Sequence, residues 1–411
     1  MKNLRRLLFL FSVCSFLLII TISFFYGCKG KREKLKIIKL PCIVDISGPY
    51  APITAPAYSG FLDACEYVNE QGGIEGVPVE AVVRDCSGKV DTAISYYTDF
   101  REMEPKPLAI FISVSAEGAA LRERIVEDDM IAMCVPGTPA LYPPSNTFGL
   151  YPMYQDMFGG FLDWLVDTWD WKKKGRNPRL AIMTWDTTYG RSIFTDEVDA
   201  YAKKKKVDIV AKEVFGVRDM DVSTQLVRVR EKKPDWIFTN VAVTGAAAIA
   251  KSAKDLKYKI KLASNTTFDW SALMIGGKIM DGSVICFSYA SWDDLKNPGT
   301  KLLTKWFKEK KRRPQERTLV YHLAWAHVLT MREVISKVVN KAGWENLDGK
   351  AIKEQMMKLK DFSPGNGITY FSFDDTRRSP SKGYIARVIN GKIIPITDWR
   401  ELPDLRNPKF K

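Results

Sequence analysis

Residues 47–93 read SGPYAPITAPAYSGFLDACEYVNEQGGIEGVPVEAVVRDCSGKVDTA, and the local signals in them follow the order of a β–α–β unit. The apolar run at 37–45 predicts a strand that ends at the Gly/Pro turn opening this stretch. A helix follows, because apolar residues recur at i, i+3 and i+4 spacing, namely Phe61, Leu62, Ala64, Cys65 and Val68. Gly72-Gly73 then supplies the positive φ angles that end a helix. A second strand is expected at 77–83, so the helix joins two strands of a parallel sheet.

The alternation of strand and helix continues along the chain. Further strands are expected at 108–114, 130–135, 179–184, 207–214 and 236–239, with helices at 119–128, 157–169, 192–204, 223–231 and 245–255. Two successive sets of similar order predict two similar α/β lobes. Parallel sheets of this kind bind ligands in the loops at the carboxyl ends of their strands. Near the end of the chain, Asn390-Gly391 between apolar runs predicts a β-hairpin.

The order of residues along the chain is similar to that of a known family. The pattern SGP…G…A…VNEQGGIEG…V…D…A is followed by IFISVSAEGAA, MIAMCVPGT, WDTTYGRS and PDWIF. This order resembles the type I periplasmic solute-binding proteins of the branched-chain amino acid transport class, over almost all of the chain after residue 36. The resemblance implies two similar lobes, each a parallel sheet flanked by helices, joined by a three-strand hinge.

The resemblance also implies where each lobe begins and ends. The chain is expected to cross between the lobes near Tyr151, Phe287 and Tyr370. Lobe 1 would then contain 36–151 and 288–369, and lobe 2 would contain 152–287 and 370–411.

The N-terminal segment predicts export. Basic residues precede an apolar run at 7–26, and Cys28 follows it. We expect 1–27 to be a signal peptide, Cys28 to be lipidated, and 28–35 to act as a tether. Simple cleaved export and an uncleaved anchor are the alternatives, since about 20 apolar residues can span a bilayer. The basic residues that follow Cys28 oppose an N-in anchor. All three alternatives place the body outside the cytoplasmic membrane, and we expect a periplasmic, membrane-tethered lipoprotein.

The formal net charge of +14 prompts the question of an acidic partner. Two clusters dominate it, Lys203-Lys204-Lys205-Lys206 and the basic run at 308–313, and both lie at the ends of amphipathic helices. Nucleic-acid-binding surfaces interleave basic residues with stacking aromatics along one face, and these clusters do not. They are interpreted as solvated helix ends, and no nucleic-acid partner is expected. Attraction to an anionic membrane surface is a secondary consequence of such clusters.

The sequence does not support catalysis or a metal site. The two histidines, His322 and His327, are five residues apart and do not form an i, i+4 metal-binding pair. No GxSxG, HExxH, GxxxxGKS or GxGxxG motif occurs. Five of the seven cysteines lie outside the leader, without a CxxC spacing, and Cys65 and Cys134 are interpreted as packing residues. We therefore expect no enzyme, no cofactor and no metal, although a carboxylate pair among the many Asp and Glu residues stays open.

The candidate binding site begins in the loop at 113–118, where a strand runs into a helix. Hydroxyls and free backbone N–H groups at a helix N-terminus bind carboxylates, although Ser115 could simply cap the helix. The resemblance implies that this loop and the next one hold the charged head of a ligand. The matching positions are Ser115, Ala116, Gly137 and Thr138. It also implies that Tyr189 closes over the ligand from the second lobe, the alternative being a surface tyrosine at a helix start.

One position departs from the family pattern. Members that bind α-amino acids place an acidic residue on the second lobe to pair with the ammonium group, and here that place falls on Thr266. A neutral hydroxyl cannot compensate a desolvated ammonium. Asp269 and Glu117 are the candidates to replace the missing acid. The ligand is therefore expected to be a small amino acid-like, carboxylate or amide solute.

The function implied is that of the extracytoplasmic substrate-binding component of an ABC importer. Its expected partners are a small-molecule ligand, an ABC transporter permease, and the membrane through an N-terminal lipid or anchor. A ligand-sensing regulatory protein of the same fold is the alternative. An extracytoplasmic enzyme and a structural envelope protein are more distant ones.

Overall fold

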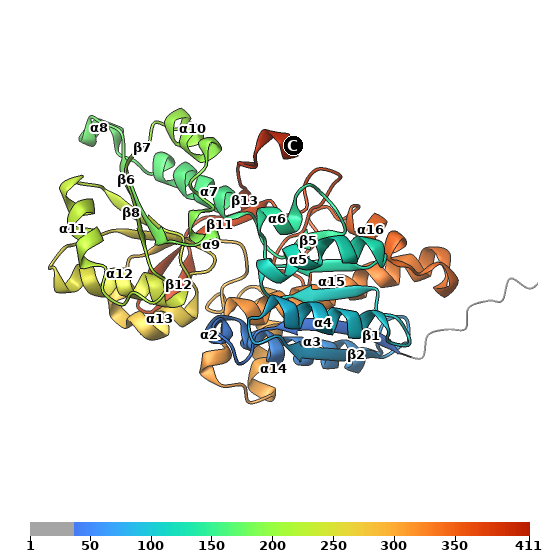
Figure 1. The fold of residues 1–411 in the computed structure, drawn as a ribbon. Helices are drawn as coiled ribbons and strands as arrows, with labels where there is room; N and C mark the ends of the chain where they lie inside the picture. Colours follow the sequence, from blue (N-terminus) through green and yellow to red (C-terminus); the bar gives the residue numbers. More distant parts are fainter. Residues whose placement is uncertain (1–36) are drawn as a thin grey trace, which may run out of the picture.

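The computed structural model describes residues 37–411 as two α/β lobes, each built on its own sheet (Figure 1). This arrangement confirms the expected fold class. The expected signal peptide, Cys28 and the tether lie outside the described residues. Within 37–411, no helix combines the length and apolar character needed to cross a bilayer.

Lobe 1 contains a five-stranded sheet in the order β2-β1-β3-β4-β5, and every neighbouring pair in it is parallel. Its strands are β1 (Ile38–Val44), β2 (Val79–Asp85), β3 (Ala109–Ile112), β4 (Ile131–Cys134) and β5 (Thr147–Gly149). The central strand β3 is buried along its whole length. Such continuous burial is typical of a parallel strand that is covered on both faces.

The two faces of the lobe 1 sheet pack against different helices. Phe111 of β3 belongs to the apolar cluster beneath α3 (Pro56–Glu70) and α15 (Leu319–Ala342). Its neighbours Ile110 and Ile112 point to the opposite face, beneath α4 (Val90–Arg101) and α5 (Ser115–Glu127). This follows from the alternation of side chains along a strand. His327 of α15 stacks on Phe61 and meets Phe111 edge-on, so it is a buried core residue.

Lobe 2 contains the larger sheet, in the order β12-β11-β10-β9-β8-β6-β7. Five of its strands are parallel: β6 (Arg179–Trp185), β7 (Asp208–Phe215), β8 (Trp236–Thr239), β9 (Leu262–Asn265) and β10 (Val284–Phe287). Strand β11 (Lys382–Ile389) runs antiparallel to β10, and β13 (Arg400–Glu401) also pairs with β11. The mixed sheet therefore takes its last strands from the end of the chain.

Helices cover both faces of the lobe 2 sheet (Figure 1). One face carries α7 (Tyr154–Asp167) and α10 (Asp196–Lys204), and the other carries α11 (Ser223–Glu231) and α12 (Val243–Asp255), with α13 (Trp270–Gly276) beside α12. The remaining elements are α2 (Ala51–Thr54), α6 (Thr138–Leu141), α8 (Trp171–Lys174), α9 (Thr188–Arg191), α14 (Pro298–Glu309), α16 (Gly349–Met356) and the 3₁₀ turns η1 (Gly277–Met280), η2 (Pro314–Glu316), η3 (Trp344–Asn346) and η4 (Pro408–Phe410).

The predicted hairpin near the C-terminus is confirmed. Strand β11 pairs antiparallel with β12 (Lys392–Pro395), and Ile389 lies opposite Lys392. Asn390 and Gly391 between them have φ angles of 51° and 70°. Both are positive, as a two-residue hairpin turn of this kind requires.

The last residues of the chain run from lobe 2 to lobe 1. The Leu405 N–H donates to Asp156 of α7 over 2.8 Å. Phe410 stacks on Tyr142, which follows α6 in lobe 1, at 5.8 Å between ring centroids. The Arg406 guanidinium lies 5.1 Å from the centroid of the same Tyr142 ring. We call residues 402–411 the C-terminal strap.

Candidate functional site

The first turn of α5 lacks a side-chain cap. The helix begins at Ser115 rather than at the expected residue 119, its N-cap residue is Val114, and no side chain there accepts a hydrogen bond. Ser115 is half-buried and Ala116 is exposed. The alternative that Ser115 is the capping residue is wrong, since Ser115 lies inside the first turn. The first N–H groups of a helix need acceptors from outside it, and they carry a partial positive charge.

The next loop of lobe 1 packs directly against this turn. Gly137 follows β4 and precedes α6, and a Cβ atom added to it would lie 2.9 Å from the Ser115 Cβ. Only glycine allows the two loops to approach so closely. Thr138, the first residue of α6, is exposed. The structure thus brings Ser115, Ala116, Gly137 and Thr138 together at the carboxyl ends of β3 and β4.

Glu117 lies behind these loops rather than on their surface. Its side chain is buried, with Oε1 3.9 Å from the Cys86 sulfur and with no hydrogen-bond partner for Oε2. Burial raises the pKa of this carboxyl group, and the charge of Asp45 raises it further. Glu117 is therefore biased toward its neutral form compared with an exposed glutamate.

On lobe 2, Tyr189 is held at the carboxyl end of β6. It lies in the short helix α9 and is half-buried, and its hydroxyl is 2.6 Å from the Thr267 Oγ1. Its ring meets the ring of Tyr154 edge-on at 4.7 Å between centroids. Burial raises the pKa of Tyr189 well above its ordinary value. The residue presents a neutral phenol, suited to an aromatic wall that excludes water.

A polar network fixes the Tyr189 loop to the neighbouring strands. The Asn240 amide, just after β8, donates to the backbone carbonyl of Tyr189 over 2.8 Å. Asn265, the last residue of β9, donates to Asn240 over 2.5 Å and accepts from the Thr267 hydroxyl over 2.7 Å. Sequence reasoning missed Asn240, Asn265 and Thr267. The sequence could have indicated them, because polar residues that directly follow buried strands lie at the carboxyl edge of the sheet and are candidates for such a network.

Three tyrosines connect the carboxyl edges of the two sheets. Tyr151 follows β5 of lobe 1, and its hydroxyl is 2.7 Å from that of Tyr154 at the start of α7. Tyr154 in turn contacts Tyr189 of lobe 2. The predicted aromatic residue of lobe 2 is therefore linked through two ring contacts to the lobe 1 edge that holds Ser115 and Gly137.

Thr266 and Asp269 occupy buried positions. Thr266 is fully buried, and its Oγ1 accepts from the Ser288 hydroxyl at 3.4 Å. Both carboxylate oxygens of Asp269 accept backbone N–H groups, from Ser271 at 2.9 Å and from Leu319 at 2.7 Å. Asp269 thereby caps α13 of lobe 2 and binds the first residue of α15 in lobe 1. Burial raises the pKa of Asp269 despite these donors.

The neighbouring Trp270 adds a second contact between α13 and α15. Its ring stacks on His322 of α15 at 6.1 Å between centroids. Its indole N–H donates to Asp293 over 2.9 Å. His322 is fully buried, and burial lowers its pKa to about 3, so it is neutral at physiological pH. Within 37–411, no group of three or more His, Cys, Asp or Glu is arranged to hold a metal ion.

Comparison with known proteins gives the family. The model for the family described as periplasmic binding protein matches residues 37–392. The chain belongs to the periplasmic binding protein family. Proteins of this family bind small-molecule ligands and work with ABC transporter permeases, and membership implies an extracytoplasmic location. No curated protein sequence is significantly similar to this binding protein.

Solved structures share the fold of this binding protein at low sequence identity. A branched-chain amino acid ABC transporter protein from Thermus thermophilus with bound valine is 16% identical, with a TM-score of 0.77 over 89% of this chain and 96% of that one. A fatty acid ABC transporter substrate-binding protein from Thermomonospora curvata is 21% identical, with a TM-score of 0.74 over 92% and 95%. A branched-chain amino acid transporter binding protein from Streptococcus pneumoniae, in complex with isoleucine, is 17% identical, with a TM-score of 0.68 over 88% and 99%. These neighbours are binding proteins of amino acid and fatty acid ABC transporters.

Proposed function

We propose that this protein is the substrate-binding component of an ABC importer, and that it holds a small amino acid-like, carboxylate or amide solute between its lobes by hinge closure. The observation that carries the proposal is the uncapped first turn of α5 packed against Gly137. Backbone N–H groups at that turn suit a carboxylate or amide oxygen. Closure by a hinge then brings the second lobe over the bound group.

Each predicted contact residue has a role in this proposal. Ser115, Ala116, Gly137 and Thr138 bind the polar head of the solute through backbone N–H groups and hydroxyls. Tyr189 covers the solute from lobe 2. The roles of Glu117, Thr266 and Asp269 as replacements for a charged partner stay predictions. Their burial favours a supporting position behind the solute over direct charge pairing.

The solute class is supported by the lack of an exposed carboxylate among the predicted contact residues. Thr266 is neutral, Glu117 is buried with a raised pKa, and Asp269 is occupied by two backbone N–H groups. A desolvated ammonium group needs a charged or strongly polar partner. Solutes with a carboxylate or amide and no ammonium group therefore suit these residues better than a free α-amino acid.

The test is a thermal-shift screen of residues 29–411 against amino acids, aromatic and aliphatic carboxylates, short amides and urea. A solute at about a hundredfold its Kd adds about 2.7 kcal/mol to the free energy of unfolding. Tyr189→Ala is expected to abolish the shift of any solute that acts on the parent protein. Tyr201→Ala is the matched control, because Tyr201 is also half-buried and hydrogen-bonded but lies on α10. A panel without any shift, or equal losses in the two variants, would contradict the proposal.

We also infer that the protein is tethered to the membrane through a lipid on Cys28. The basic and apolar leader before Cys28 supports this inference. Expression in cells fed a radiolabelled fatty acid should label the parent protein and leave Cys28→Ala unlabelled. Equal labelling of both proteins, or of neither, would exclude lipidation at this residue.

A further inference from the structure

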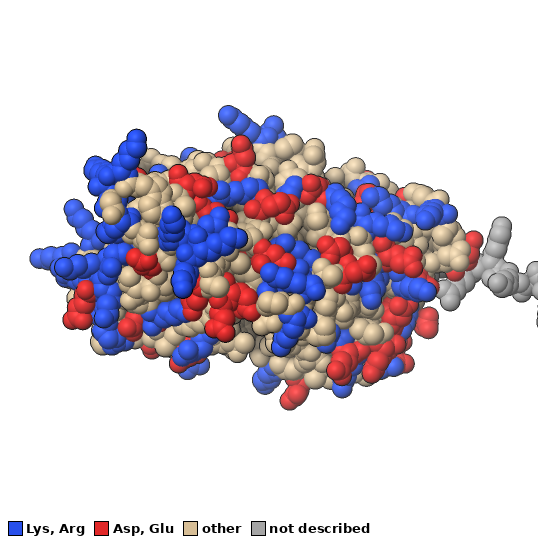
Figure 2. Space-filling view, turned by 90° about the horizontal axis from the view of Figure 1, so that it is seen from above, with Lys and Arg blue, Asp and Glu red and all other residues tan. Residues whose placement is uncertain are grey.

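The outer end of lobe 2 is strongly basic. The segments that lead into β6, β7, β8 and β9 at their amino ends are 170–179, 203–208, 230–235 and 254–261. Together they contain sixteen Lys and Arg and five Asp and Glu. We call these four segments the basic end of lobe 2. Figure 2 shows Lys and Arg gathered over the lobe 2 end of the visible face. This end is opposite to the carboxyl edge that holds Tyr189, so the proposed solute site does not account for it.

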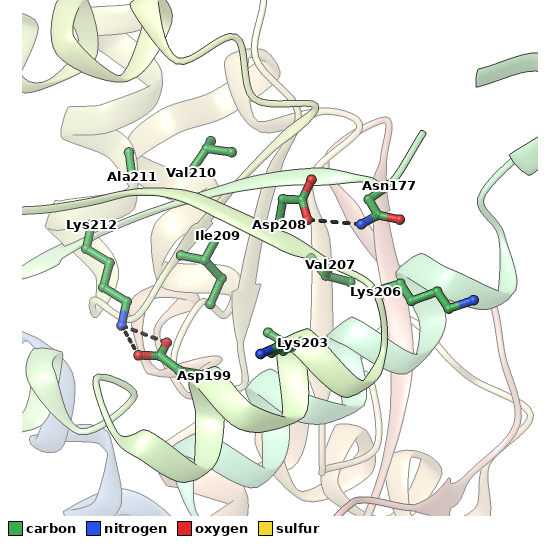
Figure 3. Close-up of a pocket in the computed structure, with 11 residues that line it drawn as sticks. Asn177, Asp199, Lys203, Lys206, Val207, Asp208, Ile209, Val210, Ala211 and Lys212 are labelled. Atoms are coloured by element: carbon green, nitrogen blue, oxygen red, sulfur yellow. Dashed lines mark hydrogen bonds and ion pairs between the residues drawn. The ribbon is translucent and has the colours of Figure 1, made fainter. Parts of the chain in front are cut away.

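One hollow at the basic end contains its own counter-charges. It has a volume of about 650 Å³ and lies between α10 and the edge strand β7. In Figure 3, Lys212 reaches Asp199, with 2.7 Å between nitrogen and oxygen, and Asn177 donates to Asp208 over 3.0 Å. Two carboxylates, those of Asp199 and Asp208, line this hollow and offset the charge of its lysines, so it is a weaker candidate for an anion than the hollow described next.

A second hollow, of about 520 Å³, contains cations without partners. Lys254, Lys261 and Arg387 line it, and among residues 37–411 their charged groups make no ion pair and donate no hydrogen bond. Lys261 lies over the ring of Trp236 at 5.4 Å from its centroid. The only acidic residue in the lining is Asp281, whose Oδ1 accepts the Gly391 N–H over 2.9 Å.

The sheet order explains how these groups come together. Strands β9, β10 and β11 are neighbours. Lys261 directly precedes β9, Ser283 directly precedes β10, and Arg387 of β11 lies opposite Val284, the first residue of β10. Neighbouring strands are about 4.8 Å apart, so the three side chains start from adjacent positions along one edge. Lys254 comes from the last turn of α12, where its charge also compensates the helix carbonyl groups.

We propose that this second hollow is a binding site for a phosphate-bearing anion. Three cations from three separate elements line this one hollow, and Ser283, Trp236 and Tyr258 line it as well. Arg and Lys together are the usual partners of phosphate oxygens. The volume lies within the ordinary range of small-molecule sites. The rest of the basic end attracts anions from a distance.

The phosphate can belong to a soluble ester or to a lipid headgroup, and two assays separate these sources. Isothermal titration of the parent protein with inorganic pyrophosphate and with glycerol 3-phosphate measures soluble anions. Co-sedimentation with vesicles of phosphatidylcholine alone, and with added phosphatidylglycerol, measures headgroups. The site variant is Lys254→Gln/Lys261→Gln/Arg387→Gln. The matched control Lys203→Gln/Lys204→Gln/Lys206→Gln removes the same charge from the same end of lobe 2.

The site variant is expected to weaken binding of the phosphate probe by at least about tenfold. This is the loss expected if only one of the three cations makes a charge-assisted hydrogen bond to the phosphate. The control variant should retain binding within about threefold, since it removes only general attraction. Binding of either probe that is weakened in the site variant and retained in the control variant supports the proposal. The probe that binds shows whether the phosphate belongs to a soluble ester or to a lipid headgroup. Absence of binding to both probes, or equal weakening in both variants, overturns it. Tyr189→Ala should bind phosphate like the parent protein, so this result is independent of the proposed solute site.

Discussion

Replacing Asp269 tests whether its carboxylate supports the fold or pairs with the solute. Asp269→Ala removes the acceptor for the Ser271 N–H, which costs about 1 kcal/mol for a helix cap. It also leaves the Leu319 N–H buried without an acceptor, which costs about 1–3 kcal/mol. The free energy of unfolding should therefore fall by about 2–4 kcal/mol. Asp269→Asn keeps one acceptor oxygen and should lose about half as much.

The assay is urea unfolding at pH 7 followed by far-UV circular dichroism, with the midpoint compared at an unchanged m-value. Asp170→Ala is the matched control, because Asp170 also caps a helix but is exposed and accepts only the Lys173 N–H. Its loss should be at most about 1 kcal/mol. The reasoning is refuted if Asp269→Ala unfolds within about 0.5 kcal/mol of the parent protein. If Asp269→Asn keeps full stability and loses the solute response, the carboxylate pairs with the solute instead.

Three further predictions concern other parts of the molecule. Burial raises the pKa of Asp156 from 3.8 to about 6. Protonation of Asp156 therefore contributes fully to stability below about pH 4, and this contribution is lost as pH rises through about 6. Asp156→Asn should remove this pH-dependent loss of about 3 kcal/mol, as measured by urea midpoints at pH 4 and pH 7. In Gly137→Ala, the added Cβ would lie 2.9 Å from the Ser115 Cβ, and solute affinity should fall while stability drops by about 1–2 kcal/mol; an unchanged affinity would separate this loop from the solute. The structure buries the thiols of Cys42, Cys65, Cys86, Cys134 and Cys286. These thiols should react with a thiol reagent only after denaturation, and rapid labelling of any of them in the native protein would contradict their burial.

Sequence alone predicted those parts of the fold that depend on local sequence patterns. The apolar run around Phe111 and the Asn390-Gly391 turn act within a few residues, and they form the expected strand and hairpin. The start of α5 was placed four residues late, because the first turn, SAEG, has no apolar period. Such a boundary depends on the loop that packs against it, here through Gly137.

The supporting contacts of the candidate site were not predictable. Asp269 binds the N–H of Leu319, fifty residues further along the chain. Tyr189 bonds to Thr267 rather than to the adjacent Thr266, a choice set by how β9 ends in space. Both contacts are set by tertiary packing, which spacing along one sequence does not contain. The role of Arg387 likewise depends on strand register, since it is opposite β10 only because β11 returns antiparallel.

The C-terminal strap contacts both lobes. Its Leu405 end is bonded to α7 of lobe 2, while Phe410 and Arg406 contact Tyr142 of lobe 1, directly after α6. The strap thus joins α6 of lobe 1 to α7 of lobe 2 by side-chain and backbone contacts, in addition to the chain segments that cross between the lobes. An affinity tag fused after Lys411 would therefore lie next to a contact between the lobes, one residue beyond Phe410.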